Sequence, residues 1–312
     1  MKCQCTKNCI KNKEELLTDI KELYEACPKC GKKTLKKAIP LKNQIKVELL
    51  DKNYKKCNFC KKRHIDIVIA HTLKILIEED QISPNASIRK IGTPLITPAT
   101  YLEKLPYLSE NTLVFITKKV DKKTAQRIIN EVPEIKSIIM GDVNKTVGIK
   151  TEKTGQNDYE LMAGCDIRCD IQNTDSGPIP IYKAQSKIHI EYPKKESLKI
   201  TQISNILNNY NNATIIDAFS GPGTLGIYAL SKNAKKVLFN DINKNAIDAL
   251  KINLKVNNID SSRYEIHNED IHNLPGLIDE KYDIALLDTF PGVETKEYEE
   301  TLKKIAKKVI VV

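Results

Sequence analysis

Short apolar runs and longer amphipathic stretches alternate along the last third of the chain. The apolar runs are rich in β-branched residues and read T-I-I-D-A-F from Thr214, V-L-F-N-D from Val237, Y-E-I-H-N-E-D from Tyr264, I-A-L-L-D-T from Ile284 and V-I-V-V from Val309. Apolar strands that are separated by helices predict a parallel sheet covered on both faces. We therefore expect an α/β domain over residues 197–312.

Residues 86–193 show shorter alternations, which predict a small α+β domain with a β-rich second half. The first half has a strand at L-V-F-I-T, a helix at T-A-Q-R-I-I-N-E-V with Asp121 as its N-cap, and a strand at I-K-S-I-I-M. Polar and apolar residues then alternate in Y-E-L-M-A-G-C-D-I-R-C-D-I and in Q-S-K-I-H-I-E-Y, with the turn-forming N-T-D-S-G-P-I-P between them. This alternation predicts strands at both segments.

Residues 1–80 form a Lys- and Cys-rich module with a metal-binding pattern. We expect a short amphipathic helix around Glu14–Glu25 and an apolar helix over Ile65–Glu79. The module contains two C-x₂-C pairs, formed by Cys27 with Cys30 and by Cys57 with Cys60. Each pair presents two thiolates to one ion, and four thiolates complete a tetrahedral zinc site. The intervening K-K-A-I-P-L and I-K-V-E-L-L predict the strands of a zinc ribbon.

The remaining cysteines have less clear roles. Three lie at the amino terminus: Cys3, Cys5 and Cys9. They either bind no metal, as is common for a terminal segment, or form a second site with His64 or another thiol. Cys165 and Cys169 stand four residues apart in a strand pattern, so both face one side, and we expect them to be buried free thiols.

The stretch D-A-F-S-G-P-G-T-L-G, from Asp217 to Gly226, lies between an expected strand and an expected helix. Its glycines allow the backbone to approach a ligand beside the amino terminus of the helix. Asp241 lies at the end of the next expected strand, where an acidic residue binds a ribose diol in nucleotide-binding folds. A carboxylate at Asp217 would oppose a pyrophosphate and suits a ligand with a positive amino group, such as S-adenosylmethionine (SAM).

These segments resemble the motifs of class I SAM-dependent methyltransferases over about residues 197–312. The stretch from Asp217 is similar to the first motif, N-D-I-N-K-N-A-I-D-A-L-K-I-N-L-K-V-N-N to the second, and N-E-D to the third. The resemblance implies a Rossmann-like sheet with parallel strands in the order 3-2-1-4-5. It also implies a set of SAM-binding residues: Asp217, Gly221, Gly223 and Gly226 around the methionine moiety, Asp241 on the ribose, Asp270 with Ile271 by the adenine, and Phe219 as a further cofactor-binding residue. The second motif further resembles that of archaeal tRNA guanine methyltransferases.

After the fourth strand, members of this class place the residues that face the methyl acceptor, and this chain has D-T-F-P-G there. Members that methylate amino groups show Asp/Asn-Pro-Pro followed by Tyr or Phe, so Asp288 would orient the acceptor and Phe290 would stack on a base. Thr289 replaces the first proline, and the proline is displaced to Pro291. A ring nitrogen, a protein side chain or a small molecule therefore stays open as the acceptor. In the alternative reading, Asp288 only caps the next helix.

Charge and composition bear on partners and compartment. The net charge is +10, and residues 1–80 account for +8 of it, with nineteen Lys and Arg against eleven Asp and Glu. A basic end favours a polyanion such as RNA, while a Lys-rich surface without such a partner stays the alternative. An apolar run long enough to span a bilayer is missing, the polar amino terminus is not a secretory leader, and clustered cysteines fit the reducing cytoplasm.

We therefore expect a cytoplasmic SAM-dependent methyltransferase that acts on a base in structured RNA, with tRNA favoured and the oligomeric state open. One alternative is a methyltransferase that acts on a protein or on a small-molecule cofactor precursor. The other is a catalytically idle protein for RNA binding or assembly. The expected sheet also lacks the carboxyl-terminal hairpin that this class adds after strand five, which leaves that strand at an exposed, aggregation-prone edge. We expect strands from residues 155–192, or failing them a partner chain, to cover it.

Overall fold

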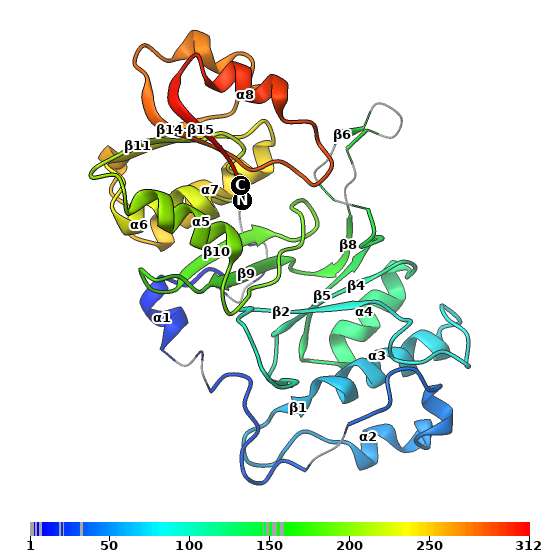
Figure 1. Cartoon of the computed structure of the whole chain (residues 1–312). Coiled ribbons are helices and arrows are strands. Elements are labelled where there is room, and N and C mark those ends of the chain that lie inside the picture. Colours follow the sequence, from blue (N-terminus) through cyan, green and yellow to red (C-terminus); the bar gives the residue numbers. More distant parts are fainter. Residues whose placement is uncertain are drawn as a thin grey trace.

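The computed structural model describes residues 3, 5, 8–18, 20, 22–31, 34–145, 147, 150–151, 155–156 and 159–312. Figure 1 shows a carboxyl-terminal α/β unit, a hairpin of β9 (Ile167–Gln172) and β10 (Ile179–Ala184) beside it, and a second sheet with helices α3 (Ile65–Glu78) and α4 (Lys122–Glu131) on its far side. No helix among these described residues is long and apolar enough to cross a membrane.

The carboxyl-terminal unit contains five parallel strands in the order β13-β12-β11-β14-β15. The strands are β11 (Thr214–Asp217), β12 (Lys236–Asn240), β13 (Tyr264–His267), β14 (Tyr282–Leu287) and β15 (Ala306–Val311). Numbered along the chain, this is the order 3-2-1-4-5. The α/β fold class expected from the apolar runs is confirmed.

Helices cover both faces of this sheet, so the apolar runs are buried throughout. Ile215 packs with the helices of one face, whereas the next residue, Ile216, packs on the opposite face with Leu274 and Leu302. The helices are α5 (Leu198–Leu207), α6 (Thr224–Lys232), α7 (Lys244–Val256) and α8 (Lys296–Leu302), with 3₁₀ helices η3 (Ser261–Arg263) and η4 (Leu274–Leu277).

The β9–β10 hairpin does not cover the edge of the sheet, so the expected cover by strands of residues 155–192 is wrong, and cover by a partner chain stays a prediction. Strands β9 (Ile167–Gln172) and β10 (Ile179–Ala184) pair with each other, and β10 contacts α7 and α6. Ile179 and Ile181 belong to the apolar cluster under these helices, so the hairpin buries its apolar face there. Within the described residues, β15 pairs with β14 alone.

The expected strand over Q-S-K-I-H-I-E-Y is also wrong, because residues 185–192 run as an irregular segment. Buried side chains of the hairpin and of the segment itself satisfy its backbone carbonyls in place of a neighbouring strand. Gln185 donates to the carbonyl of Ile188 and Lys183 donates to that of His189. A segment whose backbone is bonded in this way needs no ladder.

The middle sheet has the order β2-β4-β5-β8 and matches the expected strand–helix–strand unit. Its strands are β2 (Thr93–Ile96), β4 (Leu113–Thr117), β5 (Ile135–Met140) and β8 (Glu160–Gly164). Asp121 precedes helix α4 (Lys122–Glu131) as its N-cap, and its carboxylate accepts from the backbone N–H of Thr124. One buried cluster joins this sheet to helix α3 (Ile65–Glu78), across the expected domain boundary near residue 80.

The amino-terminal region departs from the expected zinc ribbon. Helical turns take the place of the expected strands between the two cysteine pairs: η1 (Leu41–Asn43), η2 (Val47–Leu49) and α2 (Leu50–Asn53). Leu41 and Leu50 are fully buried in the cluster that includes α3, so burial against a helix overrides strand formation. Helix α1 (Lys13–Leu17) is shorter than the expected Glu14–Glu25, part of which lies outside the described residues. The remaining strands are the pairs β1 (Arg63–His64) with β3 (Tyr107–Leu108) and β6 (Lys150–Thr151) with β7 (Gly155–Gln156).

Candidate active site and metal sites

The glycine loop connects β11 to α6, and two of its glycines are required by its geometry. Gly223 has φ +97° as the N-cap of α6, a left-handed conformation that favours glycine. At Gly226, a Cβ atom would lie 2.2 Å from the ring of Phe239 and 2.9 Å from Asp217 Oδ2. The loop therefore packs tightly against the carboxyl ends of β11 and β12.

Two carboxylates flank this loop. Asp217 is 1% exposed, and its Oδ2 accepts from the backbone N–H of Gly226 at 2.9 Å. Burial raises the pKa of Asp217 to about 7, with smaller contributions from two other carboxylates nearby. Asp241 accepts from the N–H groups of Gly221 and Asn243 at 2.8 and 2.7 Å, and burial raises its pKa as well. A cation or a hydroxyl donor would stabilise the ionised forms here.

The loop also has unused hydrogen-bonding capacity. Among the described residues, the buried hydroxyl oxygens of Ser220 and Thr224 have no hydrogen-bond partner. Both lie where the chain enters α6, whose first backbone N–H groups favour an anion. A ligand that carries both an amino group and a carboxylate, as SAM does, fits this combination of a buried acid and free donors.

The third sequence motif lies beside the same strand ends. Asp270 is exposed and its carboxylate accepts from the N–H of His272, while Ile271 is buried in the cluster on that face of the sheet. Phe219 makes an edge contact with Tyr298, at 5.1 Å between ring centroids. Apolar and aromatic side chains of this kind can enclose an adenine ring.

The residues expected to face the acceptor follow β14. Both carboxylate oxygens of Asp288 accept from Lys199 Nζ, at 2.6 and 2.7 Å. Burial raises the pKa of Asp288, and the ion pair with Lys199 opposes that rise. Phe290 is half-buried and meets His189 edge-on at 5.4 Å, whereas Pro291 is exposed.

His189, Glu191 and Lys199 therefore belong to the candidate site, although the sequence analysis did not identify them. The nitrogen Nε2 of His189 lies 3.4 Å from Glu191 Oε1. Although burial opposes it, Lys183 and His189 lower the pKa of Glu191. His189 and Glu191 alternate within a segment that resembles a strand, which gives no sign that they reach the acceptor side.

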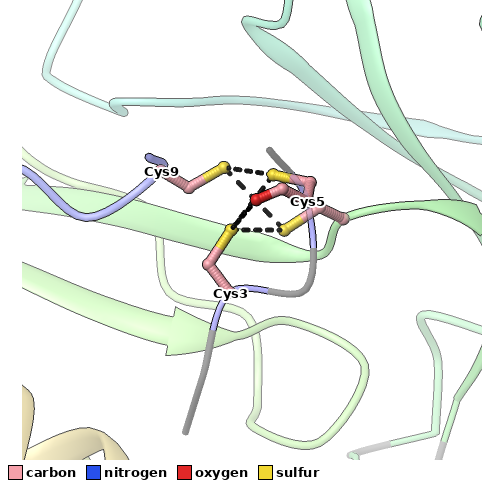
Figure 2. A group of neighbouring side chains, drawn as sticks. Cys3, Cys5 and Cys9 are labelled. Carbon is pink, nitrogen blue, oxygen red and sulfur yellow. Dashed lines mark hydrogen bonds between the residues drawn. The ribbon is translucent and has the colours of Figure 1, made fainter. Parts of the chain in front are cut away.

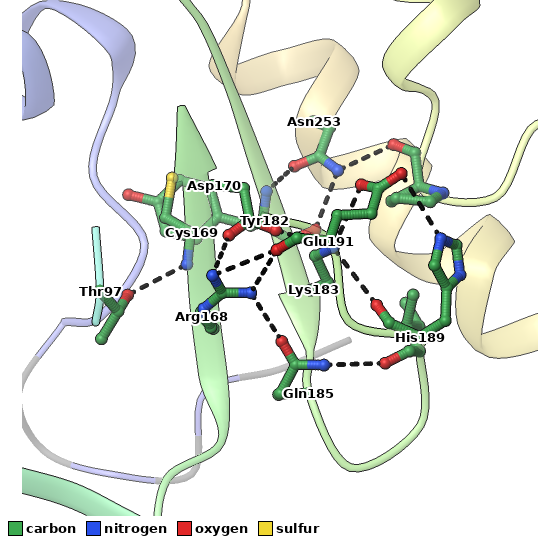
Figure 3. A network of polar contacts seen from close by, with 12 residues as sticks. Thr97, Arg168, Cys169, Asp170, Tyr182, Lys183, Gln185, His189, Glu191 and Asn253 are labelled. Carbon is green, nitrogen blue, oxygen red and sulfur yellow. Dashed lines mark hydrogen bonds and ion pairs between the residues drawn. The ribbon is translucent and has the colours of Figure 1, made fainter. Parts of the chain in front are cut away.

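A buried ion network supports this segment (Figure 3). Asp170 pairs with Arg168 Nη2 at 2.6 Å and with Lys183 Nζ at 2.7 Å, and all three side chains are 0–1% exposed. Lys183 also reaches Glu191 Oε2 at 3.3 Å. One carboxylate thus balances two cations inside the hairpin, and a second carboxylate links them to the acceptor side.

The two expected cysteine pairs come together in the amino-terminal region. The Sγ–Sγ distances are 3.7 Å for Cys27–Cys30, 3.6 Å for Cys27–Cys57 and 3.4 Å for Cys30–Cys60. Four thiolates around one zinc ion at about 2.3 Å are about 3.8 Å apart. The four thiols therefore fit one tetrahedral ion.

The carboxyl-terminal unit resembles a known protein family. Residues 187–311 match the family described as "Conserved hypothetical protein 95". The ribosomal RNA large subunit methyltransferase I of Aliivibrio fischeri is 32% identical over 88 residues, which is 27% of this chain and 22% of that protein. The tRNA (guanine(26)-N(2))-dimethyltransferase of Pyrobaculum arsenaticum is 35% identical over 79 residues, 25% of this chain and 21% of that protein. The matches span about a fifth of the length of these relatives.

Solved structures resemble this chain at lower sequence identity. The Pyrococcus horikoshii TYW2 structure in complex with MeSAdo has a TM-score of 0.45 and 16% identity, and covers 75% of this chain and 76% of that one. The complex structure of aTrm5 and tRNALeu has a TM-score of 0.40 and 18% identity, and covers 64% of this chain and 55% of that one. The curated relatives confirm the resemblance of residues 197–312 to class I SAM-dependent methyltransferases, archaeal tRNA guanine methyltransferases among them.

Proposed function

We propose that the protein is a SAM-dependent methyltransferase that modifies a base in structured RNA, with tRNA as the favoured substrate. The observation that carries this proposal is the pair of carboxylates at the ends of adjacent strands around the glycine loop, the buried Asp217 and the half-buried Asp241. The relatives with matching segments include rRNA and tRNA methyltransferases. Their names support an RNA substrate for this chain.

Each residue of the site has a role in this proposal. The cofactor supplies an electrophilic methyl group on its sulfonium. Ionised Asp217 holds the amino group and Asp241 the ribose, while Gly221, Gly223 and Gly226 let the backbone approach the methionine part. Phe219, Asp270 and Ile271 enclose the adenine. Alignment of acceptor and methyl group supplies most of the rate.

On the acceptor side, Phe290 and Pro291 flank the incoming base, and Asp288 orients its nucleophilic nitrogen. Lys199 is 50% exposed and holds Asp288 in the free protein. An arriving acceptor can donate to the same carboxylate, because each of its oxygens has a second lone pair that Lys199 does not use. His189, which packs against Phe290, limits the space for the base.

The amino-terminal region provides a surface for RNA. A cavity of about 310 Å³ beside the four-cysteine group is lined by five lysines: Lys29, Lys52, Lys55, Lys56 and Lys62. Phe59 is 64% exposed at this cavity, with Lys29 Nζ 3.7 Å from its ring centroid. Lysines bind phosphates and an exposed ring stacks on unpaired bases. In this proposal residues 1–80 bind the RNA and hold a zinc ion on Cys27, Cys30, Cys57 and Cys60. Residues 86–193 form the middle domain, and residues 197–312 form the catalytic domain.

Three measurements test the proposal. Calorimetry should show SAM binding to the wild-type protein and none to Asp217→Ala. Methyl-labelled SAM incubated with total tRNA, total rRNA and total cell protein should label the tRNA. RNA affinity should fall steeply as salt rises, because bound phosphates release counterions. Label in the protein fraction alone, or an RNA affinity independent of salt, would overturn the assignment of RNA as the substrate. Absence of SAM binding to the wild-type protein would overturn the proposed methyltransferase activity.

A further inference from the structure

The three amino-terminal cysteines converge on a cysteine from the middle of the chain. Figure 2 shows the sulfur atoms of Cys3, Cys5 and Cys9 pointing toward one another. The Sγ–Sγ distances are 3.0 Å for Cys3–Cys5 and 3.1 Å for Cys5–Cys9. Cys165 completes the group, at 3.7 Å from Cys3 and 3.9 Å from Cys9. His64, the partner considered from the sequence, is not in it.

This second group has the dimensions of a mononuclear site. All four sulfur atoms lie within 4.8 Å of one another. A tetrahedral zinc tetrathiolate has S–S separations of about 3.8 Å, within the observed span. An iron–sulfur cluster would distribute its cysteines over several metal atoms and hold them farther apart. Four soft sulfur ligands around one point select zinc over a hard cation such as Mg²⁺.

The site lies beside a short amino-terminal helix that needs tertiary contacts to be stable. Helix α1 has five residues, and helices much shorter than about 12 residues are marginal in water without tertiary support. The segment nevertheless packs Ile10, Leu16 and Leu17 against the hairpin, and the N–H of Lys11 donates to the Tyr182 hydroxyl at 3.0 Å. A metal bound by both parts would supply binding energy that holds them together.

We propose that Cys3, Cys5, Cys9 and Cys165 bind a second zinc ion. This ion would hold the amino-terminal segment against the connection between β8 and β9. This site is separate from the first one, because it shares no cysteine with it and joins different parts of the chain. Three of its ligands lie at the amino terminus, and the fourth lies in the turn between β8 and β9. Its existence does not depend on the proposed enzyme activity.

Metal analysis of the full-length protein tests this site, and Cys169 offers a matched control. Cys169 is on β9, 2% exposed, and outside the group of four. The Cys165→Ala and Cys9→Ala variants should each contain one zinc ion per chain fewer than the wild type, whereas Cys169→Ala should keep the full content. Cys57→Ala should lose the other ion and retain this one.

Two further readouts make the outcome decisive. In protein loaded with Co²⁺, the visible absorption of a tetrahedral cobalt–thiolate centre should fall in Cys9→Ala and not in Cys169→Ala. Amide hydrogen exchange in residues 8–18 should accelerate in Cys9→Ala. This variant does not alter the hairpin, so it still tests the site if Cys165→Ala does not fold. Equal zinc content in wild type, Cys165→Ala and Cys9→Ala would overturn the proposal. Iron with labile sulfide, or a disulfide among these four cysteines in freshly purified protein, would overturn it as well.

Discussion

Replacing Asp217 by Asn should stabilise the ligand-free protein at pH 8 while weakening its SAM binding. The pKa of Asp217 rises from its ordinary value of 3.8 to about 7 because the carboxyl group is buried. At about 1.4 kcal/mol for each tenfold change in proton affinity, this rise costs the folded, ionised form about 4 kcal/mol. Asparagine is neutral and nearly the same shape, and its side-chain oxygen still accepts from Gly226. The variant avoids the cost and loses the negative charge.

The pH dependence follows from the direction of the shift. Between about pH 4 and pH 7 the folded protein holds a proton on Asp217 that the unfolded chain has already released, so stability falls as pH rises through this window. Urea unfolding at pH 5 and pH 8 should show the wild type losing about 3 kcal/mol relative to Asp217→Asn. Calorimetry should show SAM affinity lowered by about 10- to 100-fold in the variant, the worth of a charged hydrogen bond.

Asp283 on β14 provides a control of opposite sign. Its ion pair with Lys307 and the hydrogen bonds from Thr214 lower its pKa to about 2. Asp283 therefore stabilises the folded state above about pH 4 and loses that contribution as pH falls through 2. Asp283→Asn should destabilise the protein at pH 8. An Asp217→Asn protein that is no more stable than the wild type at pH 8 would refute the reasoning.

Three other changes should separate buried from exposed features. Asp170→Asn leaves two buried cations without their carboxylate and should cost about 3–5 kcal/mol in urea unfolding, whereas Glu160→Gln, from an exposed pair, should cost under about 1 kcal/mol. Gly226→Ala places a methyl group against the ring of Phe239, so it should lower the free energy of unfolding by about 1–3 kcal/mol and weaken SAM binding. Gly276→Ala places its methyl group in open space and should leave both the stability and the SAM affinity unchanged. Chelation of metal from the first cysteine site should raise hydrogen exchange in the region around that site and leave the parallel sheet protected. Equal effects of each variant and its control, or uniform exchange after chelation, would contradict these expectations.

The parallel sheet and its glycine loop were predictable because the information for both is local. Continuous β-branched runs identify strands that are buried on both faces, and the loop from Asp217 to Gly226 has its glycines at positions that backbone geometry requires. The strand ends then bring Asp217 and Asp241 together, since parallel strands end on one edge. The sheet, the loop and the two carboxylates were therefore predictable from the position of each residue within its own strand or turn.

The rest of the site depends on contacts between residues far apart in the sequence. Lys199 meets Asp288 across 89 residues, and nothing near either residue indicates the partner. Residues 185–192 alternate like a strand, yet their carbonyls bond to the buried side chains of Lys183 and Gln185, so His189 leaves the strand pattern and reaches Phe290. The segment from Leu41 to Leu50 likewise turns helical because both leucines are buried in the cluster with α3.

The hairpin that the sequence could not position connects the separate parts of the molecule. Asn253 of α7 is fully buried; it accepts from the N–H of Tyr182 at 2.7 Å and donates to the carbonyls of Tyr182 and of Pro222 in the glycine loop, both at 2.9 Å. A displaced hairpin would therefore break bonds that also hold the glycine loop. Cys165 precedes this hairpin and His189 follows it, so one rigid pair of strands joins the second cysteine group to the acceptor side. The amino-terminal segment thus meets the α/β unit through the hairpin, and also directly, where the side-chain amide of Asn258 donates to Glu14 Oε1 at 3.1 Å.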